Sequence, residues 1–167
     1  MALYTIYNGP MPTAAAPIKV TTGTVVKTLL QIKLGAGVLG KVVEWGISFD
    51  GSAAATPVQC ELVETGLVFA TVTASVAADI TRLDPNAQDA TTSALVVGAS
   101  ATGYTATVEG TITATRELDV QMLPPTNPYV KQFPLGREPM VNVNSALRIR
   151  VTAGTAVNAT CYVTLEI

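Results

Sequence analysis

The amino-acid sequence predicts an all-β protein that folds as one antiparallel β-sandwich domain over residues 1–167. Three observations support this. Strand-forming Val and Thr are abundant, while only 13% of the residues carry the charged side chains that usually fill exposed helices. Apolar and polar residues alternate along several runs, as in strands with one buried face. Turn signals recur about every ten residues, which is the spacing typical of sandwiches and barrels.

Residues 1–16 are expected to form an extended N-terminal arm. Its strand-like start, "LYTIY", supplies four apolar or aromatic candidate interface residues: Leu3, Tyr4, Ile6 and Tyr7. Such an arm either pairs with the protein's own sheet or adds a strand to the edge of a neighbour's sheet. A further interpretation is that it only caps one end of the sandwich.

Four alternating runs follow in the first half of the chain, and each predicts a strand with one face in the core. The predicted core residues are, in order, Ile18 and Val20; Val26, Leu30, Ile32 and Leu34; Val43, Trp45, Ile47 and Phe49; and Val58, Cys60 and Leu62. Trp45 falls on the apolar phase of its run, which favours the core over a binding site. One or two further strands are expected within residues 104–123.

The stretch "LGAGVLGKVVEW", residues 34–45, contains Gly35, Gly37 and Gly40 in the pattern G-x-G-x-x-G and matches all but the last position of G-x-x-x-x-G-K-[ST]. A dinucleotide site needs a helix after the glycines, because the helix N-terminus binds the phosphates, but here a strand-like run follows. Val42 also lacks the hydroxyl that would bind magnesium. We therefore expect no nucleotide site. The three glycines are instead expected to adopt positive φ angles in a loop that joins two antiparallel strands.

Residues 76–97 interrupt the series of strands. They are expected to contain a short helix at 77–83 or to form a long loop. The one acidic cluster of the sequence lies here and consists of Asp79, Asp84, Asn86 and Asp89. We expect no calcium site, because Leu95 stands where a calcium loop needs a bidentate Glu, and Asx-type turns account for the acidic residues.

Residues 123–139 hold five prolines, a density that excludes a helix or a central strand. This Pro-rich loop is expected to be either functional or a rigid crossover between sheets. It supplies four more candidate interface residues: Tyr129, Phe133, Leu135 and Arg137. The alternative is that these side chains cap one end of the sandwich.

The C-terminal third predicts an antiparallel hairpin formed by residues 145–152 and 157–167. Its predicted core faces are Leu147, Ile149 and Val151 in the first strand and Val157, Ala159, Cys161, Val163, Leu165 and Ile167 in the second. Arg148 and Arg150 point outward from the first strand and are the last two candidate interface residues. They are expected either to bind carboxylates of a partner or neighbouring subunit, or to lie on a solvated edge.

Composition excludes several classes of function. The net charge is −2 with no block of Lys or Arg, so no nucleic acid partner is expected. The chain has no histidine, the commonest general base and a common metal ligand, and no Ser or Thr has an evident activator. We therefore expect no enzyme, no catalytic residue, no cofactor and no metal. No window approaches the ~20 apolar residues of a membrane helix, and the N-terminus lacks the pattern of a signal peptide.

Cys60 and Cys161 lie in strand-like runs and have no zinc-binding spacing. We expect two buried free thiols. A disulfide would require the two strands to be neighbours.

Two long stretches resemble a known family: "VVEWGISFDGSAAATPVQCELVETG" (42–66) and "PLGREPMVNVNSALRIRVTAGTAVNATCYVTLEI" (134–167). They are similar to the jelly-roll decoration, or cement, proteins of tailed-bacteriophage heads. The resemblance implies a jelly-roll-like β-sandwich, made in the bacterial cytoplasm, that assembles as a homotrimer on the outside of the virion. There it would clamp neighbouring major capsid proteins. The resemblance assigns no individual binding residue.

The alternative hypothesis is a binding module, such as a virion fibre, a spike base or a carbohydrate-binding adhesion module. It requires exposed aromatic side chains around a concave site. The sequence offers Trp45 and five tyrosines for that purpose.

Overall fold

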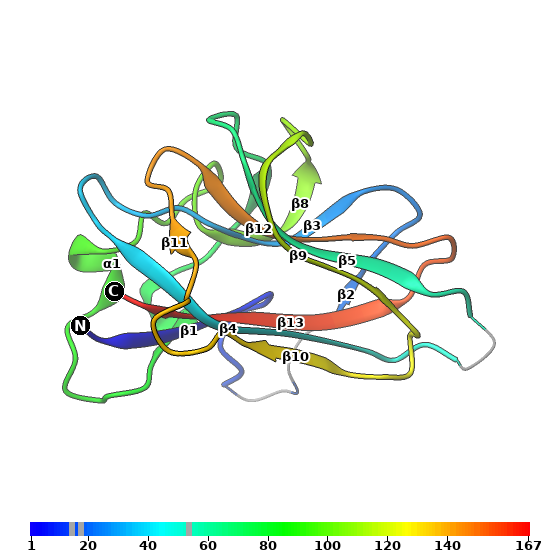
Figure 1. Cartoon of the computed structure of the whole chain (residues 1–167), viewed down its shortest axis with the longest axis horizontal. Coiled ribbons are helices and arrows are strands. Elements are labelled where there is room, and N and C mark those ends of the chain that lie inside the picture. The colour runs from blue at the N-terminus through cyan, green and yellow to red at the C-terminus, as the bar shows by residue number, and fades with distance from the viewer. Residues whose placement is uncertain (14–15, 17–18, 53–54) are drawn as a thin grey trace.

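Two antiparallel sheets pack face to face in the computed structural model, which describes residues 1–13, 16, 19–52 and 55–167 (Figure 1). Sheet A contains, in spatial order, β10 (Tyr129–Gln132), β4 (Gly40–Phe49), β13 (Asn158–Glu166), β1 (Leu3–Tyr7) and β7 (Ile80–Arg82), with β11 (Met140–Val141) beside β4 and β2 (Val20–Thr21) beside β13. Sheet B contains β6 (Thr71–Ala74), β8 (Gly103–Val108), β3 (Lys27–Ile32), β12 (Ala146–Thr152), β5 (Val58–Thr65) and β9 (Ala114–Leu123). Two short turns of helix, η1 (Ala77–Asp79) and α1 (Ala90–Ser93), complete the secondary structure. The predicted β-sandwich is confirmed.

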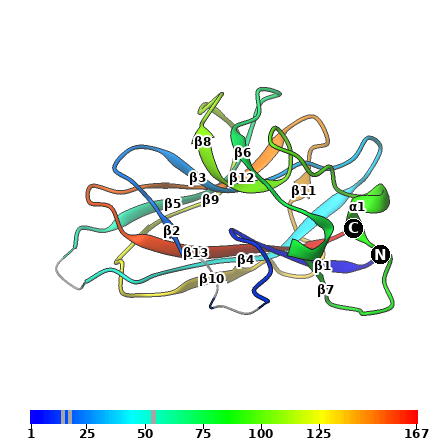
Figure 2. The same ribbon diagram turned by 180° about the vertical axis from the view of Figure 1, so that it is seen from behind.

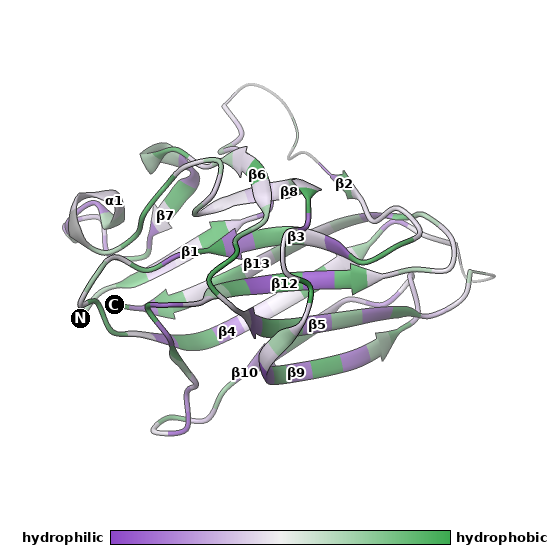
Figure 3. Cartoon of the chain, turned by 90° about the horizontal axis from the view of Figure 1, so that it is seen from above, coloured by the Kyte–Doolittle hydropathy of each residue, from purple (hydrophilic) through white to green (hydrophobic). Residues whose placement is uncertain are grey.

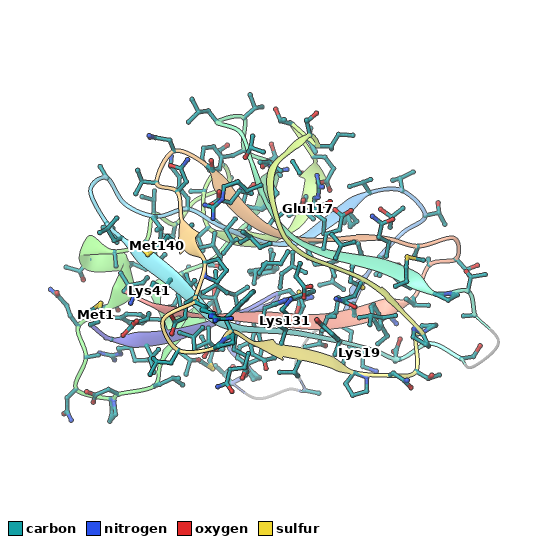
Figure 4. The ribbon with its side chains drawn as sticks, in the orientation of Figure 1. Met1, Lys19, Lys41, Glu117, Lys131 and Met140 are labelled. Atoms are coloured by element: carbon teal, nitrogen blue, oxygen red, sulfur yellow. The ribbon has the colours of Figure 1, made fainter. Side chains whose placement is uncertain are left out.

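The core lies between the sheets, where inward-facing side chains fill the space (Figure 4). Trp45 is fully buried, as its phase predicts. Also buried as predicted are Val20, Leu30, Ile32, Leu34, Ile47, Val58, Cys60, Leu62, Leu147, Ile149, Val151, Ala159, Cys161, Val163 and Leu165. Four predicted core residues are partly buried: Val26, Phe49, Val157 and Ile167. Ile18 lies outside the described residues.

The predicted hairpin between residues 145–152 and 157–167 is wrong. Both stretches are strands with the expected faces inward, but they belong to different sheets. β12 lies between β3 and β5, whereas β13 lies between β4 and β1. The loop at 153–157 therefore crosses from one sheet to the other, where the orange ribbon turns to red in Figure 1. Alternation specifies which side chains face the core, and strands of both sheets bury the same kind of face.

The glycine-rich loop also crosses between sheets, so the two strands that it joins do not pair with each other. It leaves β3 in sheet B and enters β4 in sheet A. Of its three glycines only Gly37 has a positive φ, 74°. Gly40 instead begins β4, where an added Cβ would lie 3.1 Å from a methyl carbon of Leu34. Close packing therefore favours glycine at that position.

Val43 is placed differently from its prediction as a core residue. In the pairing of β4 with β13, Glu44 lies opposite Thr164 and Val42 lies opposite Leu165, so Val43 is an extra residue. This β-bulge reverses the alternation, because two residues of one strand then face one residue of its partner. As a result Val42 is fully buried and Val43 is half-buried.

The N-terminal segment follows the first of its predicted alternatives and pairs with the protein's own sheet. Leu3–Tyr7 lies between β13 and β7. Residues 14–15 of the predicted arm lie outside the described residues. A helix at 77–83 is wrong, because the chain forms only η1 before β7 extends and pairs Ile80 with Ile6.

The Pro-rich loop follows its crossover alternative. It connects β9, at one edge of sheet B, to β10, at an edge of sheet A. Proline removes a backbone donor, and β10 is accordingly an edge strand that pairs only with β4.

Cys60 and Cys161 are free and fully buried, as predicted. They lie on opposite sheets. Burial raises the pKa of Cys60 to about 12 and raises that of Cys161 well above its ordinary value. Both thiols therefore stay protonated at neutral pH, the unreactive form of the side chain.

Thr105 in β8 has a φ of 54°, which strains a β-branched residue by about 1–3 kcal/mol. We expect Thr105→Gly to raise the free energy of unfolding by about 1 kcal/mol, because glycine adopts this φ without strain. Thr107→Gly, in the same strand without a positive φ, is expected to lower it by about 0.5–1 kcal/mol. Urea denaturation measures both changes, and a destabilised Thr105→Gly variant would contradict the strain.

Candidate contact surface

Two loops, residues 66–70 and 109–113, cover part of the outer face of sheet B (Figure 1). We call them the loop layer. Figure 2 shows them from behind, above β6 and β8. Polar side chains that point outward from β3 and β12 hold their backbones in place.

Arg148 is the main anchor of the loop layer. Its neighbours Leu147 and Ile149 face the core, so its own side chain points outward, yet none of it is exposed. Nη1 donates to the carbonyl oxygens of Glu109 (2.8 Å) and Thr111 (3.0 Å), and Nη2 donates to that of Val68 (2.9 Å). Burial lowers the pKa of Arg148 to about 10, so the guanidinium remains charged at neutral pH.

Arg150 lies two residues along the same face and is also buried. Its Nε and Nη2 donate to Oε2 of Glu61, at 3.1 and 2.7 Å, and its Nη1 donates to the carbonyl of Ile112. The prediction that Arg148 and Arg150 are free for a partner's carboxylates is therefore wrong, and so is a solvated edge. β12 is a central strand, and the loop layer covers it.

Two residues of β3 complete the attachment. Gln31, fully buried, donates to the carbonyls of Ala70 and Ala101 and accepts from the backbone N–H of Ala70 at 2.9 Å. Thr28 donates to the carboxylate of Glu109 through its backbone N–H and its hydroxyl. The loop layer is thus bound to the sheet by charged and polar groups at both loops.

Exposed apolar side chains lie on the loop layer and on the neighbouring strands β8 and β9. Leu67 is 68% exposed and Ile112 is 51% exposed. Val68 and Val108 are exposed beside them, and β9 adds Val120 and Met122, opposite Glu61 and Gln59 of β5. Figure 3 looks onto this side of the molecule, with the strands of sheet B facing the viewer. We call these six residues the contact surface.

The sequence interpretation missed all six residues of the contact surface. The available signal was weak: Leu67 follows Gly66, and Val108 and Ile112 lie two residues to either side of Gly110, and both glycines mark turns. Apolar residues beside turn glycines are also common in buried strands. The anchors Gln31 and Glu109 gave no signal of their own.

The N-terminal candidates divide into two pairs. Leu3 and Tyr7 are partly exposed, at 37% and 45%. Tyr4 and Ile6 are buried, so the prediction that they form an interface is wrong, because β1 is an interior strand with these side chains in the core. The Tyr4 hydroxyl donates to the carbonyl of Gln88 at 2.7 Å.

The Pro-rich loop candidates divide in the same way. Leu135 is 97% exposed and Arg137 is exposed, so both are available for contact. Tyr129 and Phe133 are half-buried and pack against the core. In the part of the chain that the structure describes, these four residues do not form one cluster with the contact surface.

The carboxylate of Asp119 accepts hydrogen bonds from four side chains where the edges of the two sheets face each other. Its carboxylate accepts from Trp45 Nε1 (3.1 Å), the Tyr129 hydroxyl (2.8 Å), Lys131 Nζ (3.0 Å) and Gln121 Nε2 (3.0 Å). Burial alone would raise the pKa of Asp119, but the hydrogen bonds outweigh it and hold the pKa below its ordinary value. Burial and the hydrogen bond to the Asp119 carboxylate raise the pKa of Tyr129 to about 12. This cluster joins β9 to β10.

Lys19, Asp50 and Asn158 form a hydrogen-bonded cluster at the surface. Lys19 Nζ donates to Asp50 at 2.9 Å, and Asn158 Nδ2 donates to the same oxygen at 3.2 Å. The Lys19 side chain is 58% exposed, and its hydrogen bond is the main cause that lowers the pKa of Asp50. We assign Lys19 and Asp50 as an exposed ion pair.

The acidic residues of 76–97 serve local structure. Asp84 accepts from the Asn86 backbone and Asp89 from that of Thr91, as Asx-type turns predict. Asp79 accepts from the backbone N–H groups of Met11 and Val76, beside a cavity of about 330 Å³ lined mainly by apolar groups. Within residues 1–13, 16, 19–52 and 55–167, no group of three His, Cys, Asp or Glu is placed to hold a metal ion.

No helix in the described part of the chain is long and apolar enough to cross a membrane. Comparisons with family models, with curated proteins and with solved structures each gave no match.

Asp119→Asn is expected to lower the free energy of unfolding at neutral pH by about 1–3 kcal/mol, because the amide cannot balance the charge of Lys131. The folded pKa of Asp119 lies below the value of about 3.9 in an unfolded chain, so its contribution is present above that pH and is lost as the pH falls through the folded pKa. The variant should therefore lose less stability than the parent below about pH 4. Thermal melts across pH test this, with exposed Glu117→Gln as control. An equal acid dependence in variant and parent would contradict it.

Arg148→Met is expected to lower the free energy of unfolding by about 3 kcal/mol, because three carbonyl oxygens lose their donor. Amide hydrogen exchange should rise in residues 66–70 and 109–113 while β13 keeps its protection. The exposed Arg137→Met variant should change stability by less than about 0.5 kcal/mol. Uniformly faster exchange over the whole chain would argue against Arg148 as the anchor of the loop layer.

Proposed function

We propose that this chain is a structural protein of a phage head, which binds the outside of the mature capsid and staples neighbouring major capsid proteins. The observation that carries the proposal is the contact surface, in which Leu67, Val68 and Ile112 stand on loops fixed by Arg148 and Gln31, and strands β8 and β9 supply the other three residues. A rigid apolar surface loses little conformational entropy when it binds another protein. The resemblance of 42–66 and 134–167 to phage decoration proteins supports the choice of partner.

The proposed mechanism is mechanical and involves no turnover. Copies of the chain, assembled as homotrimers, would bridge capsid subunits from outside and oppose the internal pressure of packed DNA. Many weak identical contacts on one shell add by avidity, so no single residue needs to supply high affinity. The protein would be made in the bacterial cytoplasm and would reside on the virion, without nucleic acid, membrane, cofactor or metal as partner.

The alternative, a fibre, spike-base or carbohydrate-binding adhesion module, has one observation in its favour. The cavity beside Asp79 is lined by Tyr7, Pro10, Met11 and Pro12, among others. Trp45 is buried and Tyr129 is bound to Asp119, so neither presents an exposed ring.

Cosedimentation with empty, expanded heads of the phage that encodes the chain tests the proposal. Binding that saturates at a fixed ratio to the major capsid protein is the expected result. Binding to host cells or glycans, with no binding to heads, would overturn the proposal in favour of the alternative.

The double variant Leu67→Ser, Ile112→Ser is expected to weaken binding to heads by about tenfold or more, since it places polar groups in the contact surface. Leu39→Ser is the matched control, because Leu39 is 70% exposed and Leu67 is 68% exposed. Circular dichroism should confirm that both variants fold. Equal losses in both variants would remove the contact surface from the proposal.

A further inference from the structure

We propose that Asn8 is a site of spontaneous deamidation, which the fold suppresses and which the opening of β1 permits. The proposal is independent of the proposed function. It starts from the dipeptide Asn8–Gly9 at the end of β1. Glycine has no Cβ, so its backbone nitrogen is the least hindered of any residue and can approach the preceding side chain.

The side chain of Asn8 takes the place of a backbone pair on β13. Its backbone N–H donates to the carbonyl of Cys161 at 3.1 Å, and its Oδ1 accepts from the Cys161 N–H at 2.9 Å. Its Nδ2 donates to the carbonyl of Ala159 at 3.2 Å. The carboxamide thus extends the ladder between β1 and β13 by one residue, and Asn8 is only 1% exposed.

Deamidation requires this carboxamide to be released. The backbone nitrogen of Gly9 attacks Cγ of Asn8, and the new C–N bond closes a five-membered succinimide while the bond from Cγ to Nδ2 breaks. The amide proton of Gly9 leaves with Nδ2 as ammonia. Water then adds to one of the two ring carbonyls and leaves an aspartate or an isoaspartate at position 8.

The folded structure opposes both steps. Three hydrogen bonds hold Asn8 against β13, and burial excludes the water that opens the ring. The reaction therefore proceeds from the fraction of molecules in which β1 has separated from β13. Local openings of this kind have free energies below that of global unfolding.

The modification would make the opening permanent. A carboxylate has no donor for the carbonyl of Ala159 and brings a negative charge to a buried position. An isoaspartate also adds one backbone carbon after the Cα of residue 8, so the chain that leaves β1 no longer fits the path from Asn8 to Gly9. Deamidation at position 8 therefore indicates that β1 had separated from β13 in that molecule.

Peptide mass spectrometry tests the proposal on the full chain, incubated at mildly alkaline pH in buffer and in concentrated guanidinium chloride. Asn144, which is exposed and followed by Ser145, is the internal reference. In denaturant Asn8 should deamidate faster than Asn144, and in buffer it should deamidate more slowly. The ratio of the Asn8 rate to the Asn144 rate should therefore be at least about tenfold higher in denaturant than in buffer. A tenfold change corresponds to about 1.4 kcal/mol of free energy for the opening of β1. An unchanged ratio would overturn the proposal.

Gly9→Ala should slow the reaction at position 8 in denaturant, and an unaffected rate would count against the succinimide route.

Two core variants then separate local from global opening. Ile6→Ala removes a buried side chain of β1, and Leu62→Ala removes one of β5, on the other sheet. We expect Ile6→Ala alone to accelerate the reaction at Asn8 in buffer. Equal acceleration by both variants would overturn the role of β1 opening. The comparison of buffer with denaturant uses the unmodified sequence, so it decides the main proposal even where a variant fails to fold.

Discussion

A buried guanidinium fixes the outer side of sheet B. Arg148 stands on central strand β12 and donates to the carbonyl oxygens of residues from both loops of the loop layer. It makes no described ion pair with a carboxylate, so its charge is balanced by backbone dipoles and by Glu109 nearby. If the loops moved away, the buried guanidinium would lose its hydrogen-bond acceptors, which is energetically costly. This cost holds the loops in one position. The residues of the contact surface that lie on these loops, Leu67, Val68 and Ile112, are therefore held in place as well.

The alternation of side chains was sufficient to predict the long strands and most of the core, because period two is a property of each strand alone. The short strands β6, β7, β10 and β11 were not predicted. Sheet membership could not be predicted in the same way. β12 and β13 bury equivalent faces and are joined by a short loop, and nothing in either strand distinguishes a hairpin from a crossover between sheets. The bulge at Val43 was equally hidden, since it depends on the register with β13.

The candidate site was harder to predict than the fold. Arg148 and Arg150 face away from the core, as their phase requires, but phase cannot reveal that residues from another part of the chain cover them. Their burial results from long-range contacts with 66–70 and 109–113. Tyr129 shows the same effect, since its partner Asp119 comes from the neighbouring sheet. Pairs of this kind also close the sandwich where the edge strands β9 and β10 approach each other.

The order of strands has a consequence for folding. No two strands that are consecutive in the described chain pair with each other, so neither sheet grows from a local hairpin. Proteins dominated by such non-local pairing fold on the timescale of milliseconds to seconds. A central strand of each sheet is also late in the sequence: β12, which lies beside β3 in the middle of sheet B, and β13 in the middle of sheet A. Until these two strands form, β3 is not joined to β5 and β4 is not joined to β1, and apolar faces left exposed in such incomplete sheets are prone to aggregate.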